Sequence, residues 1–175
     1  MCGAIFELKT ETMPRKNAKR ADGVDDTALE NYVRPGESIG GLIREVYRSM
    51  SRSLQARILR EGVSIGMWFV LRALWEADGL TQRELGQRVG INGPTMVTQL
   101  NAMERAGLVK RVPNLQDRRK INVFLTDQGQ QLKHKLWPMA AEVNGLALKG
   151  VSGAQAKVLS DALKQILKNL DDDRG

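Results

Sequence analysis

Three consecutive basic residues in the middle of the chain have the chemistry to bind a polyanion. Arg118, Arg119 and Lys120 end a polar stretch at 113–120 that lies between two short apolar segments. Guanidinium and ammonium groups bind phosphate oxygens, and an arginine can enter a narrow minor groove, where the potential of DNA is strongly negative. These residue types therefore predict a contact with nucleic acid.

A set of hydroxyl and amide side chains lies upstream, on the outward face of an expected helix. Its members are Asn92, Thr95, Thr98, Gln99 and Asn101. Such side chains hydrogen-bond to base edges and phosphates, and the N-terminus of a helix adds a partial positive charge that favours phosphate. Double-stranded DNA is therefore the expected partner.

The positive charge of the chain is concentrated in this same region. The whole chain has a formal net charge of +7 and a pI near 9.8. Between Arg105 and Lys120 there are six basic residues and one acid, Asp117, whereas residues 1–36 carry six of each sign. This distribution favours a polyanionic partner bound by the middle of the chain.

Two short helices joined by a glycine-containing turn are expected to position these side chains. Thr81 and Glu84 have the spacing of a capping box at the start of a helix over 82–89, and Gly90 ends that helix. The next helix covers 92–107 and has a proline in its first turn. Together the two segments predict a helix-turn-helix.

The segments on either side extend this motif to a winged helix-turn-helix over 64–126. An earlier helix begins at Ser64, and two strands rich in Val, Ile and Phe, 108–112 and 121–125, form a hairpin with a basic tip. The second short helix is expected in the major groove, while the hairpin reaches the backbone or the minor groove.

Long amphipathic segments flank this domain. Apolar residues recur at spacings of three and four from Ile39 to Ile58 and again from Val158 to Leu170. Because one small chain cannot easily cover both stripes, we expect residues 37–63 and 127–172 to form the helical dimerisation region of a homodimer. The expected fold class is mainly α with a small β-hairpin wing.

The remaining residues, 1–36, mix charges, glycine and proline with little apolar periodicity, so we expect a mobile N-terminal leader. The chain has no apolar run long enough for a membrane span and no signal-peptide core, which predicts a cytoplasmic protein without a membrane partner.

The run NGPTMVTQLNAMERAGLVKRVPNLQDRRKINVFLTDQGQQL, residues 92–132, resembles the MarR family of bacterial regulators. The family expects a recognition helix, then "ERxGLVxR" at 104–111, a "DRR" wing at 117–119 and "LTxxGxxL" at 125–132. The resemblance spans roughly 38–170. It implies a mostly helical dimer that binds palindromic operators through winged helices.

Carried over by position, the resemblance places Thr95, Thr98 and Gln99 against DNA. It makes Arg119 the wing residue, with Asp117 orienting it. Gln99 departs from the family, which often has arginine here. Because glutamine prefers adenine and arginine prefers guanine, the operator sequence of relatives cannot be transferred to this chain.

The resemblance also implies a small-molecule pocket where the dimerisation and DNA-binding parts meet, and its occupancy weakens DNA binding. Arg48, Trp68 and Arg72 fall close to positions that line such pockets, and Tyr47 and Met50 are further candidates. Since arginine pairs with a carboxylate through two hydrogen bonds, we hypothesise that the effector is an aromatic carboxylate.

Each of these assignments has a plainer alternative. Aromatic and methionine side chains at helical spacing are often simply core, and the arginines can be exposed or can pair with Glu45 or Glu76.

Other kinds of chemistry have little support in the sequence. Cys2 is the only cysteine and His134 the only histidine, so neither a metal site nor a cofactor is expected. Some members of the MarR family sense peroxide through a cysteine in the first helix, but Cys2 lies far upstream of that helix, so we expect no redox sensing. The opening Met1-Cys2-Gly3 resembles the start of glutamine amidotransferases, but the further motifs of that domain do not follow, and we expect no enzyme.

Three functions are compatible with these features. The first is a ligand-responsive repressor that an effector releases from its operator. The second is a non-specific architectural DNA-binding protein, whose affinity would come from phosphates. The third is a winged-helix module that binds another protein, which the basic wing disfavours.

Overall fold

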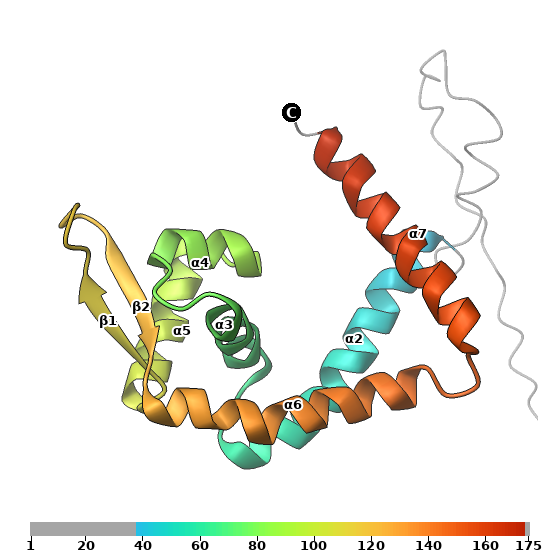
Figure 1. The fold of residues 1–175 in the computed structure, drawn as a ribbon, viewed down its shortest axis with the longest axis horizontal. Helices are drawn as coiled ribbons and strands as arrows, with labels where there is room; N and C mark the ends of the chain where they lie inside the picture. The colour runs from blue at the N-terminus through green and yellow to red at the C-terminus, as the bar shows by residue number, and fades with distance from the viewer. Residues whose placement is uncertain (1–37, 174–175) are drawn as a thin grey trace, which may run out of the picture. The chain divides into compact units, whose positions relative to one another are not determined.

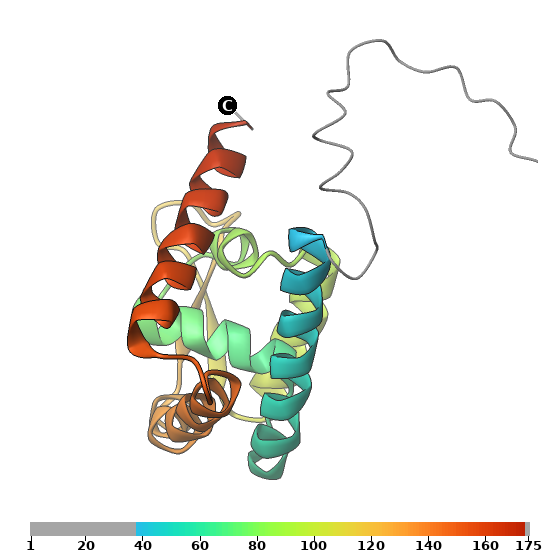
Figure 2. The ribbon, with the colours of Figure 1, turned by 90° about the vertical axis from the view of Figure 1, so that its right-hand side faces the viewer.

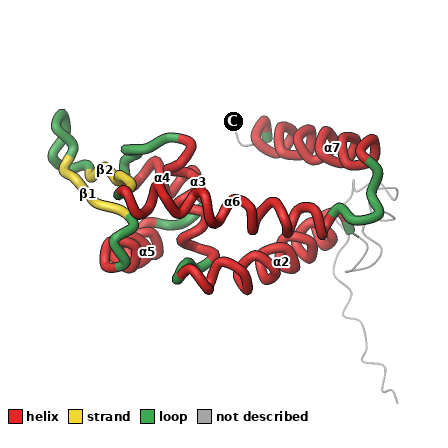
Figure 3. The backbone as a smooth tube through the Cα atoms, turned by 60° about the horizontal axis from the view of Figure 1, so that its bottom comes forward, coloured by secondary structure: helices red, strands yellow, loops and turns green. Residues whose placement is uncertain are grey.

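The computed structural model describes residues 38–173, so the expected leader and Cys2 lie outside the described residues. The predicted class, mainly α with a small hairpin, is confirmed, and Figure 3 shows the helices in red and the two strands of the hairpin in yellow. The elements are α2 (Ile39–Ile58), the 3-10 turn η1 (Leu59–Glu61), α3 (Ile65–Glu76), α4 (Gln82–Val89), α5 (Gly93–Arg105), β1 (Val109–Pro113), β2 (Ile121–Leu125), α6 (Asp127–Ala147) and α7 (Gly153–Asp172).

Side-chain caps define where the helices begin. The Thr81 hydroxyl accepts a hydrogen bond from the Glu84 amide at 3.2 Å, and the Glu84 carboxylate accepts one from the Thr81 amide at 2.8 Å. This is the predicted capping box of α4. The other N-caps are Ser64 for α3, Asn92 for α5, Thr126 for α6 and Ser152 for α7.

The two strands form an antiparallel hairpin in which Val109 pairs with Leu125 and Pro113 with Ile121. Strand β1 begins and ends one residue later than the sequence indicated. The hairpin is joined to the turn that precedes α4, because the Gly79 amide donates to the Val123 carbonyl and the Val123 amide donates to the Leu80 carbonyl. The hairpin is thereby fixed to the turn between α3 and α4.

A single apolar core lies around α3, which packs on α4, α5, α6 and β2. Figures 1 and 2 both show α3 in green lying next to α6 in orange. The fully buried side chains include Leu71, Leu74, Leu85, Met96, Leu100, Met103, Val123 and Leu136. They come from both the helix-turn-helix and α6, so these elements share one core.

Two helices carry apolar side chains that this core does not cover. No residue of α7 is buried, and Val158, Leu159, Leu167 and Leu170 are exposed on it. On α2, Ile43 and Val46 are exposed as well. Among the described residues, no helix is long and apolar enough to cross a membrane.

Candidate nucleic-acid interface and adjoining cavity

The N-terminal half of α5 presents short polar side chains to solvent. Thr95 and Thr98 are exposed, and the Thr98 hydroxyl donates to the Pro94 carbonyl at 3.2 Å. The exposed Asn92 caps the helix, since its side-chain oxygen accepts from the Thr95 amide at 3.1 Å. The cap uses the side-chain oxygen of Asn92, and the side-chain nitrogen takes no part in it.

Gln99 lies differently from the two threonines. Its side chain is half-buried against α3, where a Cβ added to Gly66 would come within 2.8 Å of the Gln99 side-chain oxygen. Asn101 is also engaged, because its side-chain oxygen accepts from the Arg111 guanidinium at 2.6 Å. The structure therefore groups Asn92, Thr95 and Thr98 on one open face and turns Gln99 toward α3.

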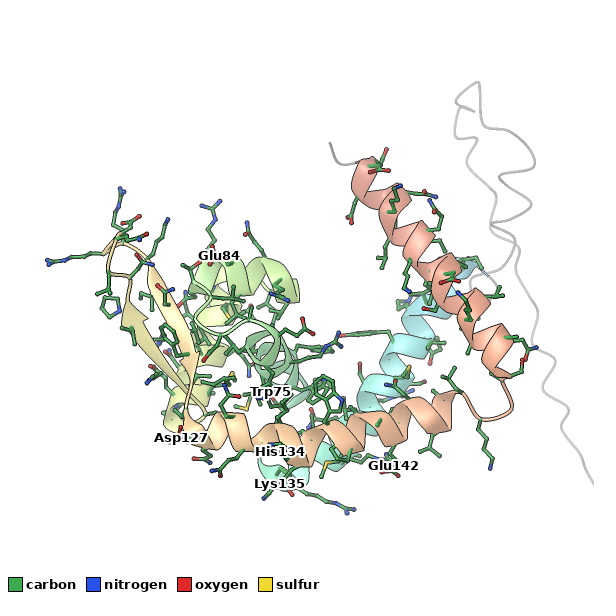
Figure 4. The ribbon with its side chains drawn as sticks, in the orientation of Figure 1. Trp75, Glu84, Asp127, His134, Lys135 and Glu142 are labelled. Carbon is green, nitrogen blue, oxygen red and sulfur yellow. The ribbon has the colours of Figure 1, made fainter. Side chains whose placement is uncertain are left out.

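The wing tip holds the predicted basic residues in an exposed turn. Asp117 accepts hydrogen bonds from the Arg119 amide at 3.1 Å and from its guanidinium Nε at 3.3 Å, while the Arg119 side chain stays 92% exposed. Lys120 Nζ lies 3.8 Å from the same carboxylate, and Arg118 is exposed. Figure 4 shows long nitrogen-bearing side chains extending from this tip.

A relay of amide side chains connects the wing tip to the helical body. The Asn114 side-chain oxygen accepts from the Asp117 amide at 2.9 Å, and its nitrogen donates to the Asn122 oxygen at 2.8 Å. The Asn122 nitrogen in turn donates to the Gly79 carbonyl at 2.6 Å. The turn that carries Arg119 is thus oriented by hydrogen bonds that start before α4.

A polar groove of about 620 Å³ separates α4 from the wing. Its lining residues are Thr81, Gln82, Arg83, Glu84, Gln87, Asp117, Arg119, Lys120 and Ile121. The pKa of Glu84 is held below its usual value by the hydrogen bond from the Thr81 hydroxyl, by a second from the Thr81 amide and by the nearby charge of Lys120. Glu84, labelled in Figure 4, therefore serves the cap as a carboxylate.

Arg83 was not among the residues singled out from the sequence. It is exposed on α4 and faces the same groove as Arg119 and Lys120. The signal that could have found it is helical spacing, because Arg83 and Gln87 are four residues apart on the side of α4 opposite its buried Leu85. Cations on both sides of a groove suit it to hold a phosphate strand.

A cavity of about 190 Å³ lies between α2, α3 and α6. Four of the five expected effector residues, Tyr47, Met50, Trp68 and Arg72, line it. Arg48 does not, and its guanidinium binds Glu45 on the exposed side of α2. Arg72 lines the cavity and also lies close to an acidic side chain, because its Nε is 3.7 Å from a carboxylate oxygen of Glu76.

Further cavity residues escaped the sequence reading. Phe69 stacks on Tyr47 with ring centroids 6.3 Å apart, and Val143 and Asn144 contribute from α6. Phe69 has a recognisable signal, since it lies next to Trp68 and one turn before Arg72 on α3. The α6 residues have none, because only the tertiary packing of α6 brings them to the cavity.

The three tryptophans of the chain lie together beside the cavity. The ring of Trp68 is 5.8 Å from that of Trp75 and 6.4 Å from that of Trp137, and the last two are 6.3 Å apart. Trp75, labelled in Figure 4, donates its indole N–H to the Gly129 carbonyl at 3.0 Å. The cluster thus joins α3 to α6.

The described residues offer no further site of the kinds considered from the sequence. His134 is exposed on α6. Among residues 38–173, no cluster of three or more His, Cys, Asp and Glu side chains is arranged to hold a metal ion.

Comparison with known proteins points in one direction. The model of the MarR family matches residues 63–121. The chain is 28% identical to the HTH-type transcriptional regulator TtmR of Methylorubrum extorquens (strain PA1), over 90% of this chain and 77% of that protein. It is also 28% identical to the organic hydroperoxide resistance transcriptional regulator of Bacillus subtilis (strain 168), over 70% of this chain and 82% of that protein.

Solved structures agree with the sequence relatives. The transcriptional regulator PA3341 is 34% identical and superposes with a TM-score of 0.69, covering 76% of this chain and 98% of its own. The PcaV transcriptional regulator of Streptomyces coelicolor, solved with its natural ligand, is 26% identical with a TM-score of 0.67, covering 78% of this chain and 96% of its own.

Proposed function

Because this chain belongs to the MarR family of transcriptional regulators, we propose that it represses transcription from a palindromic operator and is released by a small acidic effector. The observation that carries the proposal is the presentation of two surfaces by elements that share one apolar core. These are the open face of α5 and the wing turn in which Asp117 orients Arg119.

On DNA, α5 lies in the major groove and the wing lies over the adjacent minor groove. Thr95 and Thr98 then face base edges or phosphates, and Arg119 enters the minor groove. Arg83 and Lys120, on the two sides of the α4–wing groove, bind the intervening phosphate strand. Residues 64–126 act as the DNA-binding domain in this arrangement.

Gln99 reads a base only after a change of rotamer. Its amide lies against Gly66 in the free protein and must leave α3 to reach the groove. Glutamine forms two hydrogen bonds with adenine, and these offset the free-energy cost of the rotamer change where an adenine lies opposite.

A second copy of the chain covers the exposed apolar residues of α2 and α7. Two winged helices related by a twofold axis read two half-sites about one DNA turn apart, which is why the operator is palindromic. Residues 37–63 and 127–172 supply this dimerisation region. A double substitution of Leu159 and Leu167 by glutamate on α7 is expected to give a monomer in light scattering.

The cavity between α2, α3 and α6 binds the effector. Its aromatic lining, Tyr47, Trp68 and Phe69, suits an aromatic ring, and Arg72 at its edge suits a carboxylate. The ligand found in PcaV supports a ligand role for this fold. The effector acts by stabilising a spacing of the two winged helices that does not fit the operator.

Sequencing of the genomic fragments that the purified protein retains at near-physiological salt tests this function. Recovery of a few palindromic sites, lost with the double variant Thr95→Ala, Thr98→Ala, is the expected result. Recovery of fragments in proportion to their abundance would favour the architectural alternative, in which binding comes from phosphates alone.

A further inference from the structure

Leu115, at the tip of the wing, is 99% exposed and is the most exposed large apolar side chain among the described residues. Single exposed leucines are common on protein surfaces, so exposure alone assigns no role. The position of Leu115 differs from those in two respects. Its turn is held by hydrogen bonds, and its neighbours are cations.

The backbone on both sides of Leu115 is fixed. The Asn114 side-chain oxygen accepts hydrogen bonds from the amides of Gln116 and Asp117, both at 2.9 Å. The backbone N–H of Asn114 donates to the Lys120 carbonyl at 3.0 Å and closes the loop. Leu115 is therefore presented outward by a defined turn.

The surroundings of Leu115 determine which partner fits it. Arg118, Arg119 and Lys120 leave the same turn, so an apolar groove on another protein would have to neutralise them while it buried the leucine. The minor groove of DNA satisfies both demands at once. Its phosphates bind the cations, and its sugars, together with the faces of a partly unstacked base step, offer apolar surface to the leucine.

We propose that Leu115 is an apolar wedge that enters the minor groove next to Arg119 and partly unstacks a base step there. The inference rests on the proposed function, since it concerns the same wing on the same DNA. It adds that the wing reads deformability, and it predicts a bend toward the major groove at a flexible pyrimidine–purine step.

The experiment uses the duplex that the wild-type protein selects from a random-sequence library. With Leu115→Ala, we expect about tenfold weaker binding, because the apolar contact is lost. Fluorescence transfer between the duplex ends should report a smaller bend. The dependence of the affinity on salt should not change, because leucine neutralises no phosphate.

Two controls separate the wedge from general effects. Leu115→Met keeps an apolar side chain of similar volume and should restore both affinity and bend. Leu59→Ala truncates another exposed leucine, on η1, within the proposed dimerisation region, so light scattering first confirms that the variant stays dimeric. As a dimer it should change neither the affinity nor the bend.

Equal affinity and equal bend for Leu115→Ala and the wild type would overturn this inference and leave the proposed function intact. Failure of the wild type to select any duplex would overturn both.

Discussion

The carboxylate of Glu104 accepts hydrogen bonds from both the backbone amide of Arg111, at 3.0 Å, and its guanidinium Nε, at 2.9 Å. A further guanidinium nitrogen of Arg111 binds the same carboxylate. Glu104 lies in the last turn of α5 and Arg111 in β1, so the pair joins the recognition helix to the wing. Both surfaces of the proposed DNA interface are thus tied at their common base.

This pair makes the stability of the protein depend on pH. The Arg111 hydrogen bond holds the pKa of Glu104 below its usual value, so the stabilisation is fully present above the pKa of an unfolded glutamate. It is lost as the pH falls through the lower folded pKa. Urea unfolding should show Glu104→Gln destabilised by about 1 kcal/mol at neutral pH and by less near pH 3. A difference that stays constant with pH would contradict this account.

Two glycines on α6 should respond oppositely to alanine. A Cβ at Gly129 would overlap the Leu108 carbonyl oxygen, whereas a Cβ at Gly145 would meet no atom within 4 Å. We therefore expect Gly129→Ala to cost about 2–4 kcal/mol, because helix and strand must separate. Gly145→Ala should gain up to about 1 kcal/mol from helix propensity. Thermal unfolding of the two variants side by side measures both effects.

Arg119 should contribute one positive charge to DNA binding. Arg119→Ala is expected to weaken binding and to reduce the slope of log affinity against log salt by about one. Arg60→Ala, which removes an equal charge from η1 outside the winged helix, is the matched control once light scattering shows that it remains a dimer. Titrations at several salt concentrations provide the slopes, and equal slopes for Arg119→Ala and Arg60→Ala would exclude a contact by Arg119.

The two candidate arginines of the effector site should separate in a binding experiment. Only Arg72 lines the cavity, so Arg72→Ala should weaken the binding of benzoate or phenylacetate derivatives by about tenfold or more, through loss of a charged hydrogen bond. Arg48→Ala should leave it unchanged. Calorimetric titration measures both affinities, and equal losses in the two variants would refute the assignment.

The parts of the fold that depend on short-range signals could be predicted from the sequence. Thr81 and Glu84 form their capping box within four residues, and Ser64 and Ser152 cap the helices expected to follow them. The limits of the hairpin were right to within one residue, because the apolar strands contrast with their polar connection.

Contacts between distant elements could not be predicted in the same way. Helical spacing predicts Gln99 on the outward face of its helix, but the absence of a side chain at Gly66 lets its amide lie half-buried on α3. The link from Asn114 through Asn122 to Gly79 also joins segments far apart in the chain. The ion pair of Arg48 with Glu45, by contrast, is local, and it is the alternative that the sequence offers for this arginine.

The tryptophan cluster makes the protein its own optical reporter. All three indoles lie in one group, and one of them, Trp68, lines the cavity while Trp137 remains 46% exposed. Emission excited at long ultraviolet wavelengths therefore comes from a single place in the molecule. A ligand that enters the cavity changes this fluorescence emission directly. Motion of the wing tip, which has no tryptophan, leaves the emission unchanged.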